Sequence, residues 1–408
     1  MTHSQPLVDI IALNYAPEHT GTAPYTANLA EALSAGGCKV EVTTTHAHYP
    51  AWEFEGNPSW SSTDAIHGVR VKRLRHYLPR PPKGLKRLFS EVTFGLRAFF
   101  QTSHKPDVTI FVSPALFSSL IASFKPSSCR SRRIFWVQDL YSLGMSETGQ
   151  GSKLERKIMR FLEGFTLRRG HEVVVIHQRF ANYVVAELGV ESQRVTIIRN
   201  WSHVAADDLV SATSRASLRA RLDWGDDTTV VLHAGNMGIK QGLENVVSAA
   251  AVAQERNLPV KFVLMGDGSE RERLNQLGAE VENLQFLPPA SADEFVPILQ
   301  SADILLVNEL PELSAMAVPS KLTSYFAAGR PVAAATDINS VTASEVEASK
   351  GGIIISPADP SALAEACAEL GKDSHRMQSL GHQGRAYRDS VLDSEFAINA
   401  FREIISNR

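Results

Sequence analysis

The chain has 408 residues, which is too long for one ordinary hydrophobic core and therefore predicts two domains. Hydrophobic residues make up 44% and charged residues 21%, and no run of 18 apolar residues occurs, which argues against a membrane-spanning helix. The net charge of −3 is unevenly distributed: residues 1–205 hold 24 Lys and Arg against 16 Asp and Glu, and the remainder holds 17 against 28. A basic first half and an acidic second half predict different partners for the two.

The N-terminus, MTHSQPLVDIIALNYAPEHTG, lacks the basic start and long apolar core of a secretion signal. Its apolar run is better interpreted as a first strand. The three cysteines, Cys38, Cys129 and Cys367, are widely spaced without a metal-ligand pattern. We therefore expect free thiols in a reducing cytoplasm and no metal site.

Strand-like and helix-like segments alternate along the first half of the chain. The expected strands lie at 8–13, 39–45, 69–74, 107–112, 133–137, 172–176 and 195–198. The expected helices lie near 24–35, 84–101, 115–123, 152–168 and 179–188. This rhythm predicts a parallel sheet with helices on both faces. The polar stretch 202–213 has no apolar periodicity and is the expected domain boundary.

The same alternation restarts in the second half. The expected strands lie at 228–236, 260–268, 284–288, 302–308, 332–336 and 351–356. Helices are expected from 242, between 268 and 284, near 292–300, after 319, at 360–371 and over the amphipathic stretch 383–406. The sequence thus predicts an α/β protein with two doubly wound, Rossmann-like parallel-sheet domains facing across a cleft. Ligands of such sheets bind beyond the carboxyl ends of the strands.

The segment MAVPSKLTSYFAAGRPVAAAT, residues 316–336, predicts a short helix with both ends specified. Ser320 is a good N-cap directly after Pro319, and Gly329 with Pro331 ends the helix. The free N–H groups and the Lys321 cation at its start would suit a phosphate. An ordinary capped helix explains this segment alone equally well.

Two further glycine-bearing turns follow strands in the same half, GNMGIKQG at 235–242 and Gly266-Asp267-Gly268. Glycines allow backbone N–H groups to approach an anion closely. Any one turn is weak evidence, but three in one domain favour a nucleotide diphosphate. Neither GxxxxGK[ST] nor a complete GxGxxG occurs, which argues against a nucleoside triphosphatase or a nicotinamide dehydrogenase.

The order of a NYAPEHTG-like first loop, GNMGIKQGLENV, LMGDG and VPSKLTSYFAAGRPV resembles GT-B glycosyltransferases of family 4. The resemblance spans essentially the whole chain and is strongest to bacterial exopolysaccharide and O-antigen enzymes that transfer fucose or N-acetylfucosamine. It implies retaining, metal-independent transfer of a sugar from a UDP- or GDP-linked donor, without a cofactor. It also implies an acceptor domain at 1–201, a donor domain at 202–382, and a final segment, 383–408, that crosses back onto the first domain.

This sequence departs from the broader family at several positions. Two glutamates separated by seven residues hold the donor in many members, and Met316 and Ser324 occupy those positions here. The usual Arg and Lys of the first glycine turn are Asn236 and Gln241, with Lys240 adjacent. The usual His after a first-domain strand is replaced by the sequence Val-Gln-Asp, which ends in Asp139. These departures are expected to be characteristic of the VPSK subgroup.

The expected site residues follow from the motifs and the resemblance together. Donor contacts are expected from Gly21, Asn236, Gly238, Lys240, Gln241, Gly266, Asp267, Gly268, Ser320, Lys321, Leu322 and Ser324. Acceptor contacts are expected from Thr20, Tyr25, His46 and His48.

Three residues are candidates for the chemistry. Lys321 would stabilise the departing diphosphate, where negative charge grows in the transition state. Asp139 would orient a substrate, although a helix cap or loop hydrogen bond explains it equally well. Glu18 would face the donor or acceptor, with a plain surface residue as the alternative. His46 and His48 have a spacing that could bind a metal, but no third ligand is evident.

The segment 70–100 contains nine Lys and Arg and one acid, Glu91, with apolar residues interleaved. A basic amphipathic helix there would suit an anionic membrane surface and a lipid-linked acceptor. A solvated basic face on a core helix is the alternative, and nucleic acid is not expected because no motif supports it. The protein would then be cytoplasmic and peripheral on the inner face of the cell membrane.

Two other functions fit the same architecture. A sugar-nucleotide 2-epimerase would interconvert nucleotide sugars without an acceptor, and fold alone does not exclude it. A non-catalytic nucleotide-sugar-binding partner subunit would explain the loss of the family glutamates and histidine.

Overall fold

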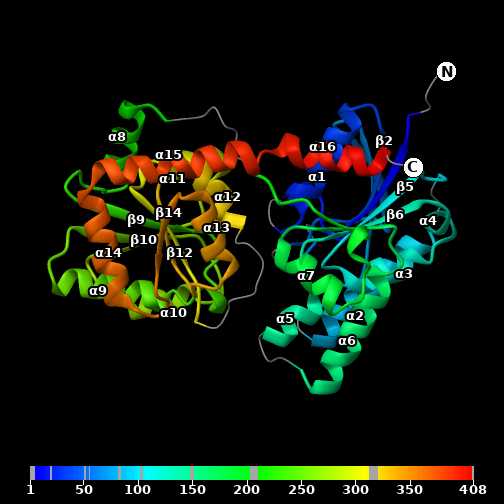
Figure 1. Cartoon of the computed structure of the whole chain (residues 1–408), viewed down its shortest axis with the longest axis horizontal. Helices are drawn as coiled ribbons and strands as arrows, with labels where there is room; N and C mark the ends of the chain where they lie inside the picture. Colours follow the sequence, from blue (N-terminus) through cyan, green and yellow to red (C-terminus); the bar gives the residue numbers. More distant parts are fainter. Residues whose placement is uncertain are drawn as a thin grey trace. The chain divides into compact units, whose positions relative to one another are not determined.

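The computed structural model describes residues 5–18, 21–49, 52–54, 56–80, 84–101, 104–147, 151–202, 210–311 and 320–406. The chain forms two compact units, the first comprising residues 1–200 with 395–408 and the second residues 201–394. Each unit contains one sheet covered by helices on both faces (Figure 1). None of the helices within these ranges is long and apolar enough to cross a membrane.

The first unit contains an eight-stranded sheet in the order β3-β4-β2-β1-β5-β6-β7-β8. Its strands are β1 (Leu7–Ile11), β2 (Lys39–Thr45), β3 (Ser61–Ile66), β4 (Val69–Leu74), β5 (Val108–Val112), β6 (Arg132–Val137), β7 (Glu172–Val175) and β8 (Val195–Ile197). All neighbours are parallel except β3 and β4. The central strand β5 is buried along its whole length because helices cover both faces of the sheet.

The antiparallel strand β3 corrects the expectation of a purely parallel sheet. Its sequence, SSTDAI, is polar and mostly exposed, so no apolar alternation marked it as a strand. His67 and Gly68, both with positive φ, join it to β4 in a tight hairpin.

The helices of the first unit connect and cover this sheet. They are α1 (Ala23–Ala35), α2 (Gly84–Phe99), α3 (Leu116–Ser123), α4 (Pro126–Arg130), α5 (Tyr141–Glu147), α6 (Lys153–Leu167), α7 (Gln178–Ala186) and α16 (Ser394–Ser406), with the 3-10 turn η1 at Ser192–Arg194. The strand order reverses between β1 and β5, so the carboxyl ends of these two strands form the switch point at which such sheets bind ligands.

The second unit contains a six-stranded, fully parallel sheet in the order β11-β10-β9-β12-β13-β14. Its strands are β9 (Thr229–Ala234), β10 (Val260–Met265), β11 (Leu284–Leu287), β12 (Ile304–Asn308), β13 (Val332–Ala335) and β14 (Gly352–Ile355). Its helices are α8 (Ala212–Arg221), α9 (Glu244–Glu255), α10 (Arg271–Leu277), α11 (Ala292–Ser301), α12 (Ser320–Ala327), α13 (Val341–Ser349), α14 (Pro360–Lys372) and α15 (Ser374–Val391), with the 3-10 turn η2 at Ile239–Gln241. Here the switch point lies between β9 and β12.

The C-terminal segment differs from the single helix expected over 383–406. The structure has two helices, α15 and α16, separated at residues 392–393. Helix α15 packs on α12, α13 and α14 and belongs to the second unit. Only residues 395–408 belong to the first unit, where the ring of Phe401 meets Trp136 and the Arg132 guanidinium donates to the Ile404 carbonyl (2.6 Å).

Candidate functional site

The two glycine turns of the second unit, residues 235–242 and 266–268, follow β9 and β10 and are packed directly against each other. Gly235 N donates to Met265 O and Met237 N to Asp267 O, both at 2.8 Å. A Cβ on Gly266 would overlap the carbonyl of Gly235, and one on Gly268 would lie 2.5 Å from Met237 O. Glycine is therefore required because the two backbones approach too closely for any side chain.

Most of the backbone N–H groups that were expected to bind an anion already donate to acceptors within the chain. Gly266 N donates to Leu287 O (3.1 Å), Gly268 N to the Asp267 carboxylate (2.8 Å) and Gly238 N to the Gln241 side chain (3.1 Å). The expectation that these N–H groups form an open cradle is corrected: they are engaged within the chain. Contact between these turns and a donor stays a prediction.

Lys321 lies at the start of α12 and points at the end of β9. Its Nζ is 3.4 Å from His233 Nε2, and an ideal Cβ on Gly235 would lie 3.9 Å from the same Nζ. His233 is fully buried, and burial holds its pKa well below its usual value, so the ring is neutral. Burial also lowers the pKa of Lys321 to about 8. The Glu309 carboxylate raises this pKa, but its effect is smaller than that of burial.

Within the described part of the chain, no ion pair joins Lys321 to a carboxylate. Glu309, whose field favours the Lys321 charge, accepts the hydroxyls of Thr336 and Thr342. A half-buried cation beside a neutral imidazole, at a helix N-terminus, would be stabilised by an incoming anion. This position is therefore the candidate anion site of the second unit.

Tyr325 fixes the position of this helix and was not anticipated from the sequence. Its buried hydroxyl accepts from Ala234 N (2.9 Å) and contacts Ala234 O (3.3 Å), so α12 is held against the last residue of β9. The sequence signal would have been an aromatic residue with a polar group on the inward face of a short helix.

The other expected donor residues differ in how far they are exposed to solvent. Asn236, Lys240 and Asp267 are exposed around the glycine turns, and Gln241 and Ser324 are half-buried. Leu322 is buried in the core of the unit, and the side chain of Ser320 lies outside the described residues.

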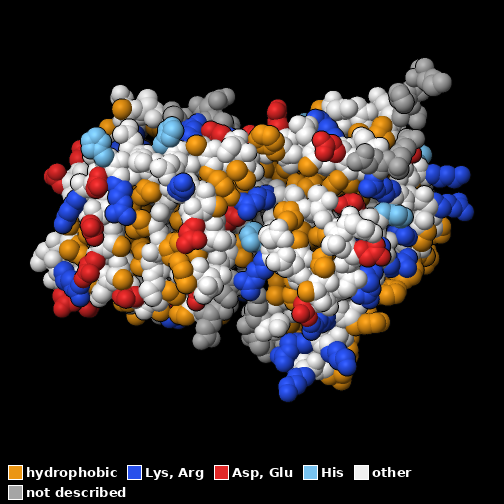
Figure 2. Space-filling model, in the orientation of Figure 1, with side chains coloured by type: hydrophobic (Ala, Val, Ile, Leu, Met, Phe, Trp, Pro, Cys, Tyr) orange, Lys and Arg blue, Asp and Glu red, His pale blue; other side chains and the backbone are white. Residues whose placement is uncertain are grey.

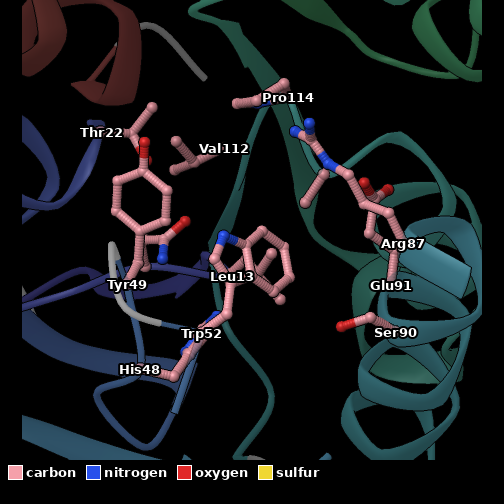
Figure 3. Close-up of a pocket in the computed structure, with 12 residues that line it drawn as sticks. Leu13, Thr22, His48, Tyr49, Trp52, Arg87, Ser90, Glu91, Val112 and Pro114 are labelled. Carbon is pink, nitrogen blue, oxygen red and sulfur yellow. The ribbon is translucent and has the colours of Figure 1, made fainter. Parts of the chain in front are cut away.

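The first unit has a pocket at the switch point between β1 and β5 (Figure 3). The residues that line this first-unit pocket are Leu13, Asn14, Thr22, His48, Tyr49, Trp52, Arg87, Ser90, Glu91, Val112, Pro114 and Ala115. Two aromatic rings, Tyr49 and Trp52, come from the segment after β2, and Arg87 and Glu91 come from α2. Aromatic surface with a few convergent polar groups is the usual composition of a small-molecule site.

Glu91, like His48, is a buried ionisable group that lines the first-unit pocket. Its oxygens accept the hydroxyl of Tyr141 and the amide of Phe117 (3.1 Å). Burial raises the pKa of this carboxyl to about 7, although the two hydrogen bonds and the nearby Arg87 guanidinium act in the opposite direction. Glu91 can therefore gain or lose a proton near neutral pH.

Glu18 is buried rather than a surface residue. Asn14 Nδ2 donates to one of its oxygens (2.7 Å), and the amides of His48 and Tyr49 both donate to the other (2.9 Å). Its carboxylate thus joins the loop after β1 to the loop after β2. A role for Glu18 in the chemistry stays a prediction.

The expected acceptor residues within the described ranges have different surroundings, although His48 Nδ1 lies 3.0 Å from His46 O. His48 lines the first-unit pocket and contacts Thr45 Oγ1 (3.1 Å), whereas His46 contacts Ser59 O (3.0 Å). Tyr25 is buried in α1, and Thr20 lies outside the described residues. Gly21 is exposed, with φ of 65°. No group of three His, Cys, Asp or Glu suited to a metal occurs among the described residues.

Asp139 lies at the carboxyl end of β6 with its side chain exposed. One oxygen accepts the amide of Leu140 (2.8 Å), as the loop interpretation expected. The next two amides, of Tyr141 and Ser142, donate to the buried carboxylate of Glu163 in α6 (2.8 and 3.1 Å). Asp139 therefore sits on a loop that is anchored by α6.

The basic segment 70–100 uses much of its charge inside the first unit. Only Gly84–Phe99 is helical, and residues 69–74 form β4. Ion pairs join Arg70 to Glu41, Arg73 to Asp64 and Arg80 to Glu53, and Arg97 lies over the ring of Trp60 (3.8 Å). The strand and the helix lie where the sequence predicted them, but the basic side chains of the segment have largely internal partners.

Two doubly wound α/β units, each with a candidate ligand site at its switch point, are the architecture of the GT-B class. Residues 20–201 match the model of a glycosyl transferase 4-like domain, and residues 228–373 match that of glycosyl transferases group 1. A relative from Escherichia coli strain K12, WcaI, named as a colanic acid biosynthesis glycosyl transferase, is 32% identical over 332 residues, or 78% of this chain and 81% of the relative. The chain belongs to the GT-B glycosyltransferases of family 4.

Two solved structures share the fold across the whole chain. Sucrose-phosphate synthase from Thermosynechococcus elongatus has a TM-score of 0.74 at 17% identity and covers 98% of both chains. Anabaena HepE in complex with UDP-glucose has a TM-score of 0.72 at 16% identity and covers 98% of this chain and 100% of HepE.

Proposed function

We propose that this glycosyltransferase moves a hexose, or a deoxy- or amino-hexose, from a nucleotide-diphospho-sugar to a lipid-linked or saccharide acceptor in surface polysaccharide synthesis. The observation that carries the donor assignment is Lys321, a half-buried cation at the start of α12 next to the buried, neutral His233. The diphosphate of a UDP- or GDP-linked donor would supply the anion that this position favours.

In the proposed reaction the bond between the sugar C1 and the diphosphate oxygen breaks, an acceptor hydroxyl oxygen forms the new bond to C1, and its proton passes to the departing diphosphate oxygen. Negative charge grows on the departing diphosphate, and the Lys321 ammonium stabilises it. Retention of configuration on one face of the sugar needs no strong base. Asp139 would orient a substrate hydroxyl with its remaining carboxylate oxygen.

The first-unit pocket is the proposed acceptor site. The rings of Trp52 and Tyr49 offer flat apolar surface to a sugar, and Glu91 offers a carboxyl that exchanges its proton near neutral pH. Arg87 adds a cation suited to a phosphate-bearing acceptor.

The names of the relatives support the acceptor and donor classes. WcaI is named for colanic acid biosynthesis, and HepE was solved with UDP-glucose. A lipid-linked acceptor would place the protein at the inner face of the cell membrane. Contact of segment 70–100 with anionic lipid is part of this proposal, with Phe89, Leu96 and Phe100 exposed on and after α2.

A transfer assay tests the proposal. UDP- and GDP-sugars are incubated with the protein and lipid extract, and release of nucleoside diphosphate is measured together with glycosylated product. We expect release that depends on the acceptor, survives EDTA and is lost in Lys321→Ala, with the anomeric configuration of the product retained by NMR. Conversion of the nucleotide sugar without an acceptor would indicate an epimerase instead. Binding of the nucleotide sugar without any turnover would indicate a partner subunit.

A further inference from the structure

Helix α6 directs four of its large apolar side chains away from the core of the first unit. Leu154, Ile158, Phe161 and Phe165 have exposed fractions of 66%, 50%, 63% and 38%. Their spacing of four, three and four residues places them in one stripe on a helix. The opposite side of the helix is buried at Glu163, Thr166 and Leu167. A helix that packs on a globular core normally has the reverse arrangement.

The stripe continues onto the end of α3. Phe124, which follows α3 and is 46% exposed, stacks on Phe165 with ring centroids 6.4 Å apart. Phe165 stacks in turn on Phe161 at 6.3 Å. These five residues, Phe124, Leu154, Ile158, Phe161 and Phe165, form a continuous apolar surface that we call the α6 face. A surface of this size is unusual on a protein with no partner.

Most charged side chains around the α6 face are basic. Lys153 and Lys157 are exposed beside the stripe, and the Arg169 guanidinium lies 3.8 Å from the centroid of the Phe124 ring. The one exposed acid of the helix is Glu155, which accepts the amide of Ser152 in a capping box. Figure 2 shows Lys and Arg side chains at the tip of the first unit where Figure 1 places α6, with hydrophobic side chains beside them. An apolar stripe edged by lysine is complementary to anionic headgroups over an apolar interior.

Helix α6 is firmly attached to the rest of the unit. Glu163 on its buried side accepts the amides of Tyr141 and Ser142, and the Tyr141 hydroxyl donates to Glu91 in the first-unit pocket. Two hydrogen-bonded steps therefore connect the α6 face to the proposed acceptor site. If the acceptor is lipid-linked, docking of the α6 face on the membrane would bring the acceptor site close to its substrate. This part of the inference rests on the proposed function.

We propose that the α6 face docks on an anionic lipid bilayer. The outward rings and aliphatic chains enter the boundary between headgroups and acyl chains, and Lys153 and Lys157 contact the headgroups. The docking element is thus α6 with Phe124, in addition to the basic segment 70–100, whose arginines are largely paired within the unit.

Co-sedimentation of the full chain with vesicles tests this proposal. Vesicles of phosphatidylcholine are compared with vesicles that also contain phosphatidylglycerol, at low and high salt. The test variant is Ile158→Ser with Phe161→Ser, which changes two exposed side chains. The matched control is Phe396→Ser on α16, since Phe396 is 61% exposed on a helix of the same unit. Thermal unfolding confirms that both variants fold.

We expect the wild-type chain to bind the anionic vesicles, with binding weakened by salt, and the double variant to bind about tenfold less or weaker still. Phe396→Ser should bind like the wild type, and Lys153→Gln with Lys157→Gln should lose mainly the dependence on phosphatidylglycerol. Vesicle binding that survives in the Ile158→Ser, Phe161→Ser variant, or no binding by the wild type, would overturn the proposal. A wild-type dimer that the same variant converts to monomers, without vesicle binding, would assign the face to a second copy.

This measurement does not depend on catalysis. Donor binding in solution, measured by thermal shift with nucleoside diphosphates, reports on Lys321 alone. If the protein binds nucleoside diphosphates but not vesicles, the proposed function is retained and the docking proposal is rejected. If it binds vesicles but not nucleoside diphosphates, the docking proposal is retained and the donor assignment is rejected.

Discussion

The donor region of the second unit is formed mainly by backbone groups, whereas the first-unit pocket is formed mainly by side chains. In the donor region, the backbones of residues 235–242 and 266–268 are in direct contact, and one side chain, Lys321, supplies the charge. In the first-unit pocket, the surface comes from side chains, notably Trp52, Arg87 and Glu91. The first region should therefore be sensitive to any added atom, whereas the second should respond to changes of charge and proton binding.

The largest effect is expected from Gly266→Ala. The new methyl group would overlap the Gly235 carbonyl, and the φ of 141° is one that alanine rarely adopts. We expect a loss of more than about 4 kcal/mol in the free energy of unfolding, or no folded protein. Urea denaturation measures this loss. The control is Gly225→Ala, where the nearest atom to the new methyl is at 3.9 Å. A Gly266→Ala protein as stable as this control would contradict the packing argument.

Lys321→Ala removes the cation of the donor region. We expect kcat/KM to fall by about 100-fold or more, because the loss concerns charge that develops in the transition state. Steady-state transfer rates measure it. Lys240→Ala provides the comparison, since Lys240 is an exposed lysine in the glycine turn and should change the rate only about two- to threefold. Equal effects of the two substitutions would remove the special role of Lys321.

Glu91→Gln tests the titrating group of the first-unit pocket. The folded pKa of about 7 lies above the ordinary value of 4.5, so the folded chain holds a proton that the unfolded chain releases between these values. The contribution of the carboxyl to stability is therefore full below about pH 4.5 and is lost as pH rises through about 7. Relative to the wild type, the glutamine variant should gain up to about 3 kcal/mol between pH 4.5 and 8.

Glu163→Gln is the matched control for this experiment. Burial raises the Glu163 pKa to about 7 as well, but this residue does not line the first-unit pocket. Both variants should show the stability change across the same pH range, whereas only Glu91→Gln should raise the KM for the acceptor. An unchanged acceptor KM in Glu91→Gln would remove Glu91 from the proposed site.

Glu18→Gln separates a structural from a catalytic role. The carboxylate accepts hydrogen bonds from Asn14, His48 and Tyr49, so we expect a loss of about 1–2 kcal/mol in the free energy of unfolding. The kcat of the folded variant should change less than about threefold. A fall in kcat of about 100-fold at unchanged stability would show that the expected catalytic role was right.

A smaller effect is expected from pH on donor binding. The pKa of Lys321 is about 8 in the free protein, so its charge is lost as pH rises through this value. Binding of a nucleoside diphosphate should weaken between pH 7 and 9 in the wild type and vary little in Lys321→Ala. Isothermal titration measures both. A wild-type affinity that is flat across this range would contradict the assigned environment of the lysine.

The same difference between the two regions explains what the sequence could predict. Lys321, the glycines and the helix cap lie in short continuous motifs, and the structure brings the lysine and the glycine turns together as expected. The first-unit pocket gathers residues from segments up to about a hundred positions apart, so no local pattern marked Trp52 or Arg87. In the sequence Glu91 differs from its neighbours only as the single acid of a basic stretch, and its burial, like that of Arg73 and His76 in the same stretch, follows from tertiary packing.

For the fold, apolar periodicity predicted the parallel strands but missed the polar edge strand β3 and the short helices α4, α5, α8 and α13. It also merged α15 and α16, because both are amphipathic and only two residues separate them. The outward stripe of α6 escaped detection for a physical reason: periodicity reveals that a helix has an apolar face but not the side on which the core lies.

The central claim is that a nucleoside diphosphate binds at Lys321, and a thermal-shift screen of UDP, GDP and related diphosphates with their sugars tests it most directly. We expect one base to raise the melting temperature, because a ligand that binds only the folded state stabilises it. The shift should vanish in Lys321→Ala and persist in Lys240→Ala. A screen in which no diphosphate shifts the wild-type transition would contradict the donor assignment, and the glycine turns would then be explained by loop packing alone.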